Sequence, residues 1–124
     1  MKVLLLGWLG VRSKNSAAMT AFYRDVLGLE VLEEQTTGAG FCLADRTEVH
    51  VYDDDDEFHE FFGSAPVIGF LVDSFAEAQA AMLQFGIEFL YPEAQRHAGR
   101  AWQHFRAPNG NVYEIIGPDD LDAE

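Results

Sequence analysis

The chain has 124 residues, which suits one domain, and its 48% of apolar residues is typical of a globular protein rather than a disordered or fibrous one. With 21 acidic against 8 basic residues, the net charge of −13 repels phosphate backbones and anionic membrane surfaces, which excludes nucleic acid and membrane partners. The same charge favours a cationic small molecule or a divalent metal.

The compartment is predicted from two features of the sequence. The single cysteine, Cys42, lies in an apolar strand-like run and cannot form an intrachain disulfide. Arg12 and Lys14 follow the amino-terminal apolar run, which argues against a cleaved secretion signal. We therefore expect a cytoplasmic protein.

The first half of the chain predicts one strand, one helix and three further strands. Residues 3–12 are apolar on both alternating faces, so we expect this strand to be buried on both faces. Asn15 or Ser16 can cap a helix that ends at Gly28. Its apolar residues at helical spacing are Met19, Phe22, Tyr23, Val26 and Leu27. Strands are predicted over residues 29–34, 40–44 and 47–52.

The second half predicts the same order of elements. Residues 66–72 form an apolar strand, and Ser74 with Glu77 forms a capping box that opens a helix running to Gly86. Strands follow over residues 87–91, 100–107 and 111–116. Four phenylalanines are expected where helix and sheet meet, namely Phe22, Phe70, Phe85 and Phe89.

The two halves also match residue by residue. Residues 28–32 match residues 86–90 at an offset of 58, and the same offset carries Ser16 onto Ser74. When the fourth strands are matched by their turns and alternation, His50 stands opposite Glu114.

The predicted fold class is α+β, with two βαβββ modules in tandem. We expect modules at 1–52 and 66–117, an acidic linker at 53–65 and an acidic tail at 118–124. The acidic run at 53–57 lacks the spacing of a calcium-binding loop, so it is interpreted as part of the linker.

Glu114 is the clearest candidate for a functional residue. Alternation places it with Val112 and Ile116 on one face of the last strand, so a carboxylate sits on an apolar face. A buried charge needs a partner, and Arg106 or Arg12 could supply a salt bridge. A metal or a bound molecule could do so instead.

The preceding strand supplies further candidates. Residues 100–106 alternate, so Trp102, His104 and Arg106 share one face. If Phe105 faces the helix, His104 lies on the opposite face and could act as a third metal ligand.

Three segments of the chain carry a resemblance to a known family. They are residues 22–29, residues 70–74 leading into the second helix, and Pro108-Asn109-Gly110 with Glu114 four residues after the glycine. The chain resembles the vicinal oxygen chelate superfamily, which includes glyoxalase I, ring-opening dioxygenases and fosfomycin- and bleomycin-resistance proteins. The resemblance implies a cupped mixed sheet with a helix on the outer face of each module. It also implies metal ligands on the first and last strand of each module.

The four implied ligand positions fall on Trp8, His50, Val67 and Glu114. Trp8 and Val67 cannot bind a metal, so only His50 and Glu114 remain, fewer than the three protein ligands usual for a catalytic metal. His104 could complete the set. Trp8 is read either as packing in the space of a metal or as a stacking plate for a planar ligand.

Two functions follow, with a third reading beside them. The leading one is sequestration of a cationic or aromatic compound in an aromatic, acidic cup without a cofactor, similar to bleomycin-resistance proteins. The residues expected to contact the compound are Trp8, His50, Val67, Trp102, His104 and Arg106. The alternative is a lyase, isomerase or dioxygenase dependent on zinc, nickel, manganese or iron, with His50 as ligand and Glu114 as ligand or catalytic base. In the third reading, the cup is simply filled core. A homodimer is expected because cups of this family are often completed by a second chain.

Overall fold

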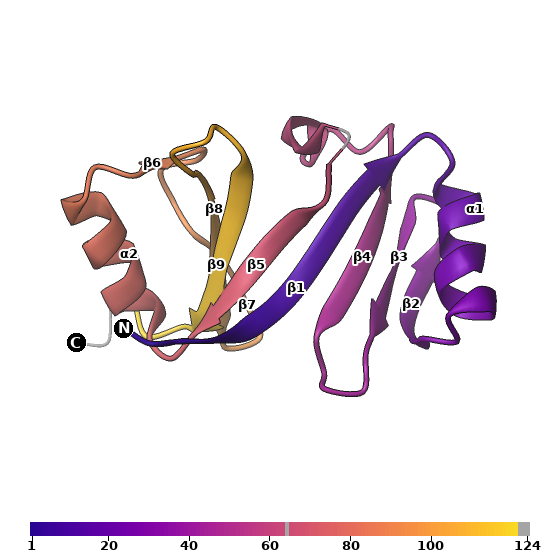
Figure 1. Ribbon diagram of the computed structural model, residues 1–124, viewed down its shortest axis with the longest axis horizontal. Coiled ribbons are helices and arrows are strands. Elements are labelled where there is room, and N and C mark those ends of the chain that lie inside the picture. Colours follow the sequence, from indigo (N-terminus) through magenta and orange to yellow (C-terminus); the bar gives the residue numbers. More distant parts are fainter. Residues whose placement is uncertain (64, 122–124) are drawn as a thin grey trace. The chain divides into compact units, whose positions relative to one another are not determined.

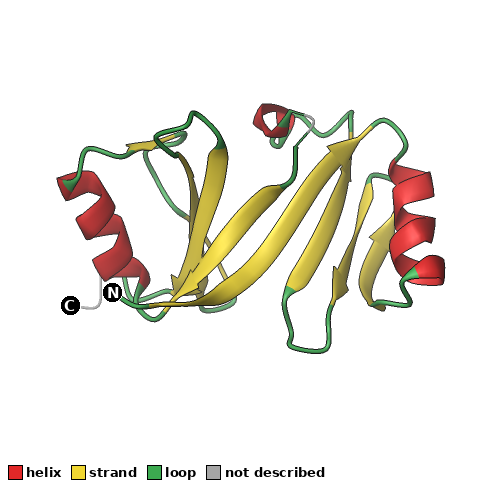
Figure 2. Cartoon of the chain, in the orientation of Figure 1, coloured by secondary structure: helices red, strands yellow, loops and turns green. Residues whose placement is uncertain are grey.

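The computed structural model describes residues 1–63 and 65–121. Over these residues the backbone forms nine strands and two α-helices, joined by short π and 3-10 turns (Figures 1 and 2), so the predicted α+β class is confirmed. The chain divides into two compact units. The first unit is Trp8–Val67, and the second unit combines Met1–Gly7 with the residues from Ile68 onward.

The first unit contains a four-stranded sheet with one helix against it (Figure 1). Its elements are β1 (Val3–Ser13, from Trp8 onward), α1 (Ser16–Ala21), β2 (Glu30–Gln35), β3 (Gly38–Cys42), β4 (Glu48–Asp53) and the 3-10 turn Glu60–Phe62. The strand order is β2-β3-β4-β1, and β1 and β4 run parallel. Phe41, Val49 and Val51 form a buried cluster with Ala39, against which Met19 and Tyr23 pack.

The predicted first helix is shorter than expected. α1 ends at Ala21, and a π turn covers Phe22–Val26 before Gly28, whose φ of 67° agrees with the predicted helix end. A π turn takes one residue more per hydrogen bond than an α turn, which displaces later residues from the apolar stripe. Phe22, where this turn begins, and Val26, where it ends, are exposed by 43% and 71%, so their predicted packing is wrong. Asn15 occupies the N-cap but makes no side-chain capping bond, contrary to expectation.

The second unit contains the second predicted module. Its elements are β5 (Val67–Val72, from Ile68 onward), α2 (Phe75–Gln84), β6 (Glu88–Phe89), β7 (Gln95–His97), β8 (Arg100–Arg106) and β9 (Val112–Pro118). The strand order is β5-β9-β8-β6, β7 pairs with β8, and β5 and β9 run parallel. The hydroxyl of Ser74 accepts a hydrogen bond from the main-chain N–H of Glu77 at 3.1 Å, so the predicted helix start is confirmed.

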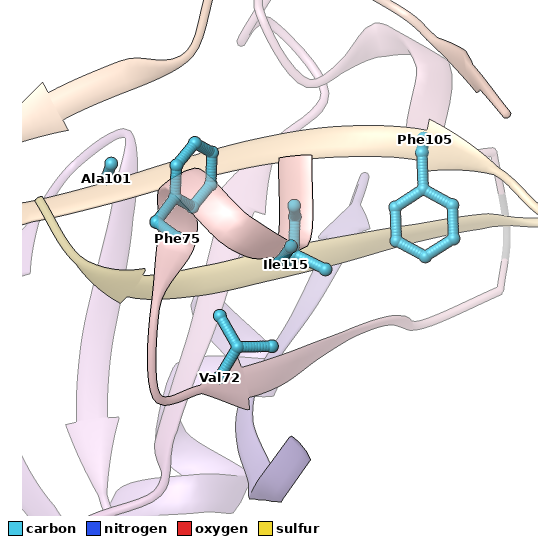
Figure 3. Close-up of a cluster of buried hydrophobic side chains, with 6 residues drawn as sticks. Val72, Phe75, Ala101, Phe105 and Ile115 are labelled. Carbon is cyan, nitrogen blue, oxygen red and sulfur yellow. The ribbon is translucent and has the colours of Figure 1, made fainter. Parts of the chain in front are cut away.

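The core of the second unit lies between α2 and one face of this sheet. Val72, Phe75 and Ile115 belong to one buried cluster with Ala101 and Phe105 of β8 (Figure 3). Phe75 and Val72 are fully buried. Because Phe105 and Ile115 face α2, alternation turns their neighbours His104 and Glu114 to the opposite face.

Several predictions for the second half need correction. The strand expected over 87–91 is reduced to Glu88–Phe89, and β7 was not predicted. Phe70 and Phe89 pack against the core as expected, whereas Phe85 is 86% exposed. Phe85 follows the last residue of α2, where the helical spacing no longer sets the direction of a side chain. The predicted tail begins inside β9, and its residues 122–124 lie outside the described residues.

The first half of β1 departs most from expectation. Val3, Leu4, Leu5 and Leu6 are exposed by 40% to 53%, although both faces of this strand were predicted to be buried. An apolar run indicates that a segment avoids water, but it does not indicate which molecule covers it. No helix among the described residues is long and apolar enough to cross a membrane.

The strand registers agree with the predicted equivalence of His50 and Glu114. β1 and β4 place Gly10 beside His50, and β5 and β9 place Gly69 beside Glu114. His50 and Glu114 thus occupy equivalent positions, each beside a glycine of the parallel first strand of its module. The repeat in sequence is therefore a repeat in backbone structure.

Each module also fastens the start of its helix with the same pair of residue types. The hydroxyl of Ser16 donates to Asp53 at 3.0 Å, and the hydroxyl of Ser74 donates to Asp120 at 2.6 Å. The main-chain N–H of Asp55 and the Ser16 hydroxyl lower the pKa of the Asp53 carboxyl. The Ser74 hydroxyl and the main-chain N–H of Ala76 lower the pKa of Asp120. We call these two hydrogen bonds the serine–aspartate latches.

Candidate functional site

A deeply buried polar contact of the second unit joins His104 and Glu114. The two residues lie directly opposite each other in the β8–β9 ladder, and His104 Nε2 is 3.1 Å from Glu114 Oε2. Their side chains are only 2% and 3% exposed. The face predicted for Glu114 is therefore confirmed, and an imidazole stands beside its charge. Such a pair can share or pass a proton.

Arg106, one of the partners that the sequence left open for Glu114, makes its contacts elsewhere. Arg106 Nη1 donates to the main-chain oxygen of Gly110 at 2.9 Å, and Nε lies 3.9 Å from Glu88 Oε1. Arg12, the other predicted partner, donates from Nε to the main-chain oxygen of Asp56 at 3.1 Å. Arg106 fell on the predicted face by alternation, but a long side chain at a strand end can turn toward the nearby turn instead.

Trp102 lies on the same face of β8 as His104, as alternation predicted. It is partly buried and stands opposite Ile116 in the β8–β9 ladder. Gln103 points the other way, accepting from Gln79 of α2 and donating to the main-chain oxygen of Tyr91. The contact of Trp102 with a bound molecule stays a prediction.

In the first unit, Trp8 lies over Gly10 of its own strand. A Cβ atom added at Gly10 would overlap the indole ring of Trp8, so the close approach requires glycine. The indole centroid is 5.6 Å from His50 and 6.1 Å from Phe62, and Trp8 is 7% exposed. This arrangement is that of a packed side chain, and a stacking role for Trp8 stays a prediction.

His50 lies on the face of β4 that is turned away from α1. Its neighbours Val49 and Val51 pack in the cluster beside α1, so alternation places His50 with Trp8. His50 Nε2 is 2.8 Å from Glu48 Oε1. Gly40 of β3 lies opposite His50, at the position that His104 occupies relative to Glu114.

His59, to which the sequence pattern assigned no role, lies in an aromatic cluster of the first unit. Its ring is stacked on Tyr52 with centroids 3.6 Å apart and planes 13° apart. Its Nδ1 is 2.9 Å from Asp56 Oδ2. The available signal was the spacing of Asp56 and His59 at i and i+3, among the phenylalanines Phe58, Phe61 and Phe62.

Among the described residues, the positions implied for metal ligands do not supply the three protein ligands usual for a catalytic metal. Val67, at an implied ligand position, has a hydrocarbon side chain that is 2% exposed and cannot bind a metal. In the second unit, His104 and Glu114 form a pair of potential metal ligands. Over the described residues of the first unit, three or more potential ligands gather only at Asp53–Asp55. Asp53 there already accepts from Ser16 and from the N–H of Asp55. Over the described residues of each unit, the side chains at the implied ligand positions do not fit a three-ligand metal centre.

Cys42 is a core residue, as predicted. It is 3% exposed, and burial is the main cause that raises the pKa of its thiol. A buried thiol of raised pKa holds little thiolate at neutral pH, so Cys42 is not suited to act as a nucleophile.

Known proteins share this fold over almost the whole chain. The solved structure of a hypothetical protein from Bacillus halodurans C-125 has a TM-score of 0.71 and 17% identity over 93% of this chain and 94% of that one. Methylmalonyl-CoA epimerase from Mycobacterium tuberculosis has a TM-score of 0.73 and 16% identity over 98% and 93%. A variant of the Streptomyces coelicolor epimerase in complex with 2-nitronate-propionyl-CoA has a TM-score of 0.67 and 16% identity over 95% and 99%. At these identities the likeness shows the fold alone.

A comparison with curated proteins finds no significant match. A family model does match, over residues 5–115, and it describes the glyoxalase, bleomycin resistance protein and dioxygenase superfamily. That match spans both helices and ends one residue after Glu114. The chain belongs to the glyoxalase/bleomycin resistance protein/dioxygenase superfamily.

Proposed function

We propose that this protein binds a cationic or aromatic small molecule and sequesters it without a metal centre. The observation that supports this proposal is the residue type at two of the four positions where the family resemblance places metal ligands. Trp8 and Val67 stand there, both are buried, and neither has an atom that can ligate a metal. Trp8 instead belongs to an aromatic cluster with His50 and Phe62.

The remaining two positions support the same function. His50 lies 2.8 Å from the carboxylate of Glu48, and Glu114 lies 3.1 Å from the imidazole of His104. A side chain that already contacts a neighbouring side chain must give up that contact before it can coordinate a metal. These two pairs instead offer hydrogen-bonding groups beside aromatic or apolar side chains, a combination typical of small-molecule sites.

The net negative charge of the chain favours a cationic ligand over an acyl-CoA such as the one in the Streptomyces complex. A CoA ester carries several phosphate charges, and a protein with a net charge of −13 repels it. Some of the few arginines are already engaged in ion pairs. Arg24 lies 2.8 Å from both Asp25 and Glu34, and Arg96 lies 2.7 Å from Asp119. An anionic substrate would find few free cationic partners, whereas a cation is attracted at long range.

Binding can be tested by titrating the full chain with planar aromatic cations such as ethidium and acridine orange. Quenching of the two tryptophans and thermal shift are the readouts, and neutral anthracene derivatives of similar size are the matched controls. We expect saturable binding of a cation; at 100 times its Kd it should stabilise the fold by about 2.7 kcal/mol. If no cation binds while a divalent metal raises the melting temperature, the proposal is overturned.

A metal-dependent lyase, isomerase or dioxygenase remains the second candidate. The observation that favours it is the buried pair of His104 and Glu114, two potential donors side by side in a family that includes dioxygenases. Elemental analysis of the purified protein tests it. Near-stoichiometric zinc, nickel, manganese or iron that is lost in Glu114→Gln would favour the enzyme, and a metal-free protein that binds aromatic cations would reject it.

We propose that the protein is a homodimer and that the exposed apolar strand residues 3–6 lie in its interface. These four apolar residues are exposed by 40% to 53% in the single chain. A contiguous exposed apolar patch of this kind marks a surface that a partner covers. Sedimentation equilibrium tests this with Leu4→Lys, which should shift mass from dimer to monomer. Leu83→Lys, at a 59% exposed leucine of α2, is the control. A wild-type monomer, or equal effects of both variants, would contradict the proposal.

A further inference from the structure

His59 is enclosed by aromatic rings on several sides. Its imidazole is stacked on Tyr52, with centroids 3.6 Å apart. The ring centroids of Phe58 and Phe62 lie 4.9 and 5.0 Å from that of His59, and their planes are nearly perpendicular to it, at 77° and 73°. A fourth ring, Phe61, lies 6.4 Å away. We call these four rings and the Asp56 carboxylate the His59 cage.

The chemistry of this cage suits a planar cation. A cation placed on the face of a tyrosine ring is attracted by the π electrons, and the attraction grows when the site is sheltered from water. Asp56 Oδ2 lies 2.9 Å from Nδ1 at the edge of the imidazole, where a carboxylate can accept an N–H from a cation. The side chains of His59 and Asp56 are 15% and 22% exposed, so the site is sheltered but reachable.

The cage is fixed by contacts that do not involve the imidazole. The main-chain N–H of His59 donates to Asp56 Oδ1 at 3.1 Å, which orients the carboxylate whatever side chain stands at position 59. Arg12 holds the main-chain oxygens of Asp54 and Asp56. Tyr52 belongs to β4, and Phe62 is 5% exposed. The walls should therefore survive removal of the His59 ring.

We propose that the His59 cage is a binding subsite for a planar organic cation, and that the His59 imidazole occupies it as a tethered stand-in. A ligand with an amidinium, guanidinium or imidazolium group would displace the ring, stack on Tyr52 and donate to Asp56. The inference rests on the proposed function, because it names the part of a cationic ligand that this protein recognises.

Chemical rescue tests the subsite. His59→Ala should remove the stand-in, and methylguanidinium or imidazolium should then bind the emptied cage and raise the melting temperature with saturation. His97→Ala removes an exposed histidine of β7 and is the matched control. Phenol serves as a neutral ring of similar size, and sodium chloride is matched throughout. In His59→Ala/Asp56→Asn, the affinity for methylguanidinium should fall about tenfold because a charge-assisted hydrogen bond is lost.

The wild-type chain gives a second readout in case His59→Ala folds poorly. Methylguanidinium should move the ring resonances of His59 in the NMR spectrum to a saturating value, and those of His97 should stay in place. Equal binding to the His59 and His97 variants, an affinity for phenol as high as for the cations, or no response of the His59 ring would each overturn the subsite.

The subsite and the proposed function can fail separately. If methylguanidinium fills the cage but no larger aromatic cation binds the wild-type chain, the subsite stands and the sequestration function falls. If the aromatic cations bind wild type while the cage accepts no small cation, the function stands and the subsite falls.

Discussion

The two units share one backbone plan and differ in what they carry on the face turned away from the helix. In the first unit, this face carries Trp8, His50 and Tyr52, which contact one another as rings. In the second unit, it carries His104 and Glu114, which form a buried polar pair. The equivalent registers show that the repeat specifies the positions of side chains and leaves their chemistry open.

One pair of equivalent positions accounts for much of the difference. Opposite His50 the first unit has Gly40, and opposite Glu114 the second unit has His104. A glycine leaves His50 room beside its ring, and the imidazole lies within stacking distance of Trp8 and Tyr52. An imidazole opposite Glu114 instead provides a partner for a charge that could not otherwise be buried cheaply.

The largest effect expected is that of breaking the polar pair of the second unit. His104→Leu leaves the Glu114 carboxylate buried beside an apolar side chain, which should lower the free energy of unfolding by about 3–5 kcal/mol. Urea unfolding measures this. His104→Leu/Glu114→Leu is the control, because removing both polar partners should recover part of the loss. A single variant as stable as wild type would show that the pair is not a linked buried unit.

A smaller effect is expected from crowding the aromatic face of the first unit. In Gly10→Ala, the new methyl group meets the Trp8 ring, so repacking should cost about 1–3 kcal/mol. In a Trp8→Leu background the same change should cost less, because the smaller side chain leaves space. Thermal or urea unfolding of the four proteins measures the coupling. Equal costs in both backgrounds would contradict the packing of Trp8 over Gly10.

The serine–aspartate latches predict a dependence of stability on pH that both units share. The pKa values of Asp53 and Asp120 are lowered in the folded state, so their contribution is fully present above the unfolded pKa of about 3.9 and is lost as the pH falls through the folded value. Asp120→Asn and Asp53→Asn should therefore cost stability at pH 7 and much less at acid pH. Urea unfolding across that range measures it. A cost that is independent of pH would contradict the role of the charge.

The smallest change in the free energy of unfolding is expected at Phe85, which the sequence pattern predicted to lie in the core. Phe85 is 86% exposed, so Phe85→Ser should change the free energy of unfolding by no more than about 0.5 kcal/mol. Phe75→Ala, at the fully buried first residue of α2, should cost about 3–5 kcal/mol. Urea unfolding of the two variants gives the comparison. A large loss in Phe85→Ser would mean that its ring is covered in solution.

Much of the architecture could be predicted from the sequence because it depends on local periodicity. The alternation around Glu114 and Phe105 set their faces, since successive side chains of a strand point to opposite sides. Ser74 and Glu77 marked a helix start because the capping bond forms within four residues. Matching the fourth strands of the two halves by their turns and alternation set His50 opposite Glu114, because repeated patterns fold into repeated registers.

Only the tertiary structure decided how these groups are paired. His104 lies beside Glu114 because β8 and β9 align in one register, and the sequence alone left Arg106, Arg12, a metal and a ligand open as partners. The His59 cage depends on a loop folding back onto Tyr52, which no periodic pattern encodes. The exposure of residues 3–6 likewise depends on what covers a strand and not on its composition. Local chemistry thus determined the elements and their faces, and long-range contacts determined which charges and rings meet.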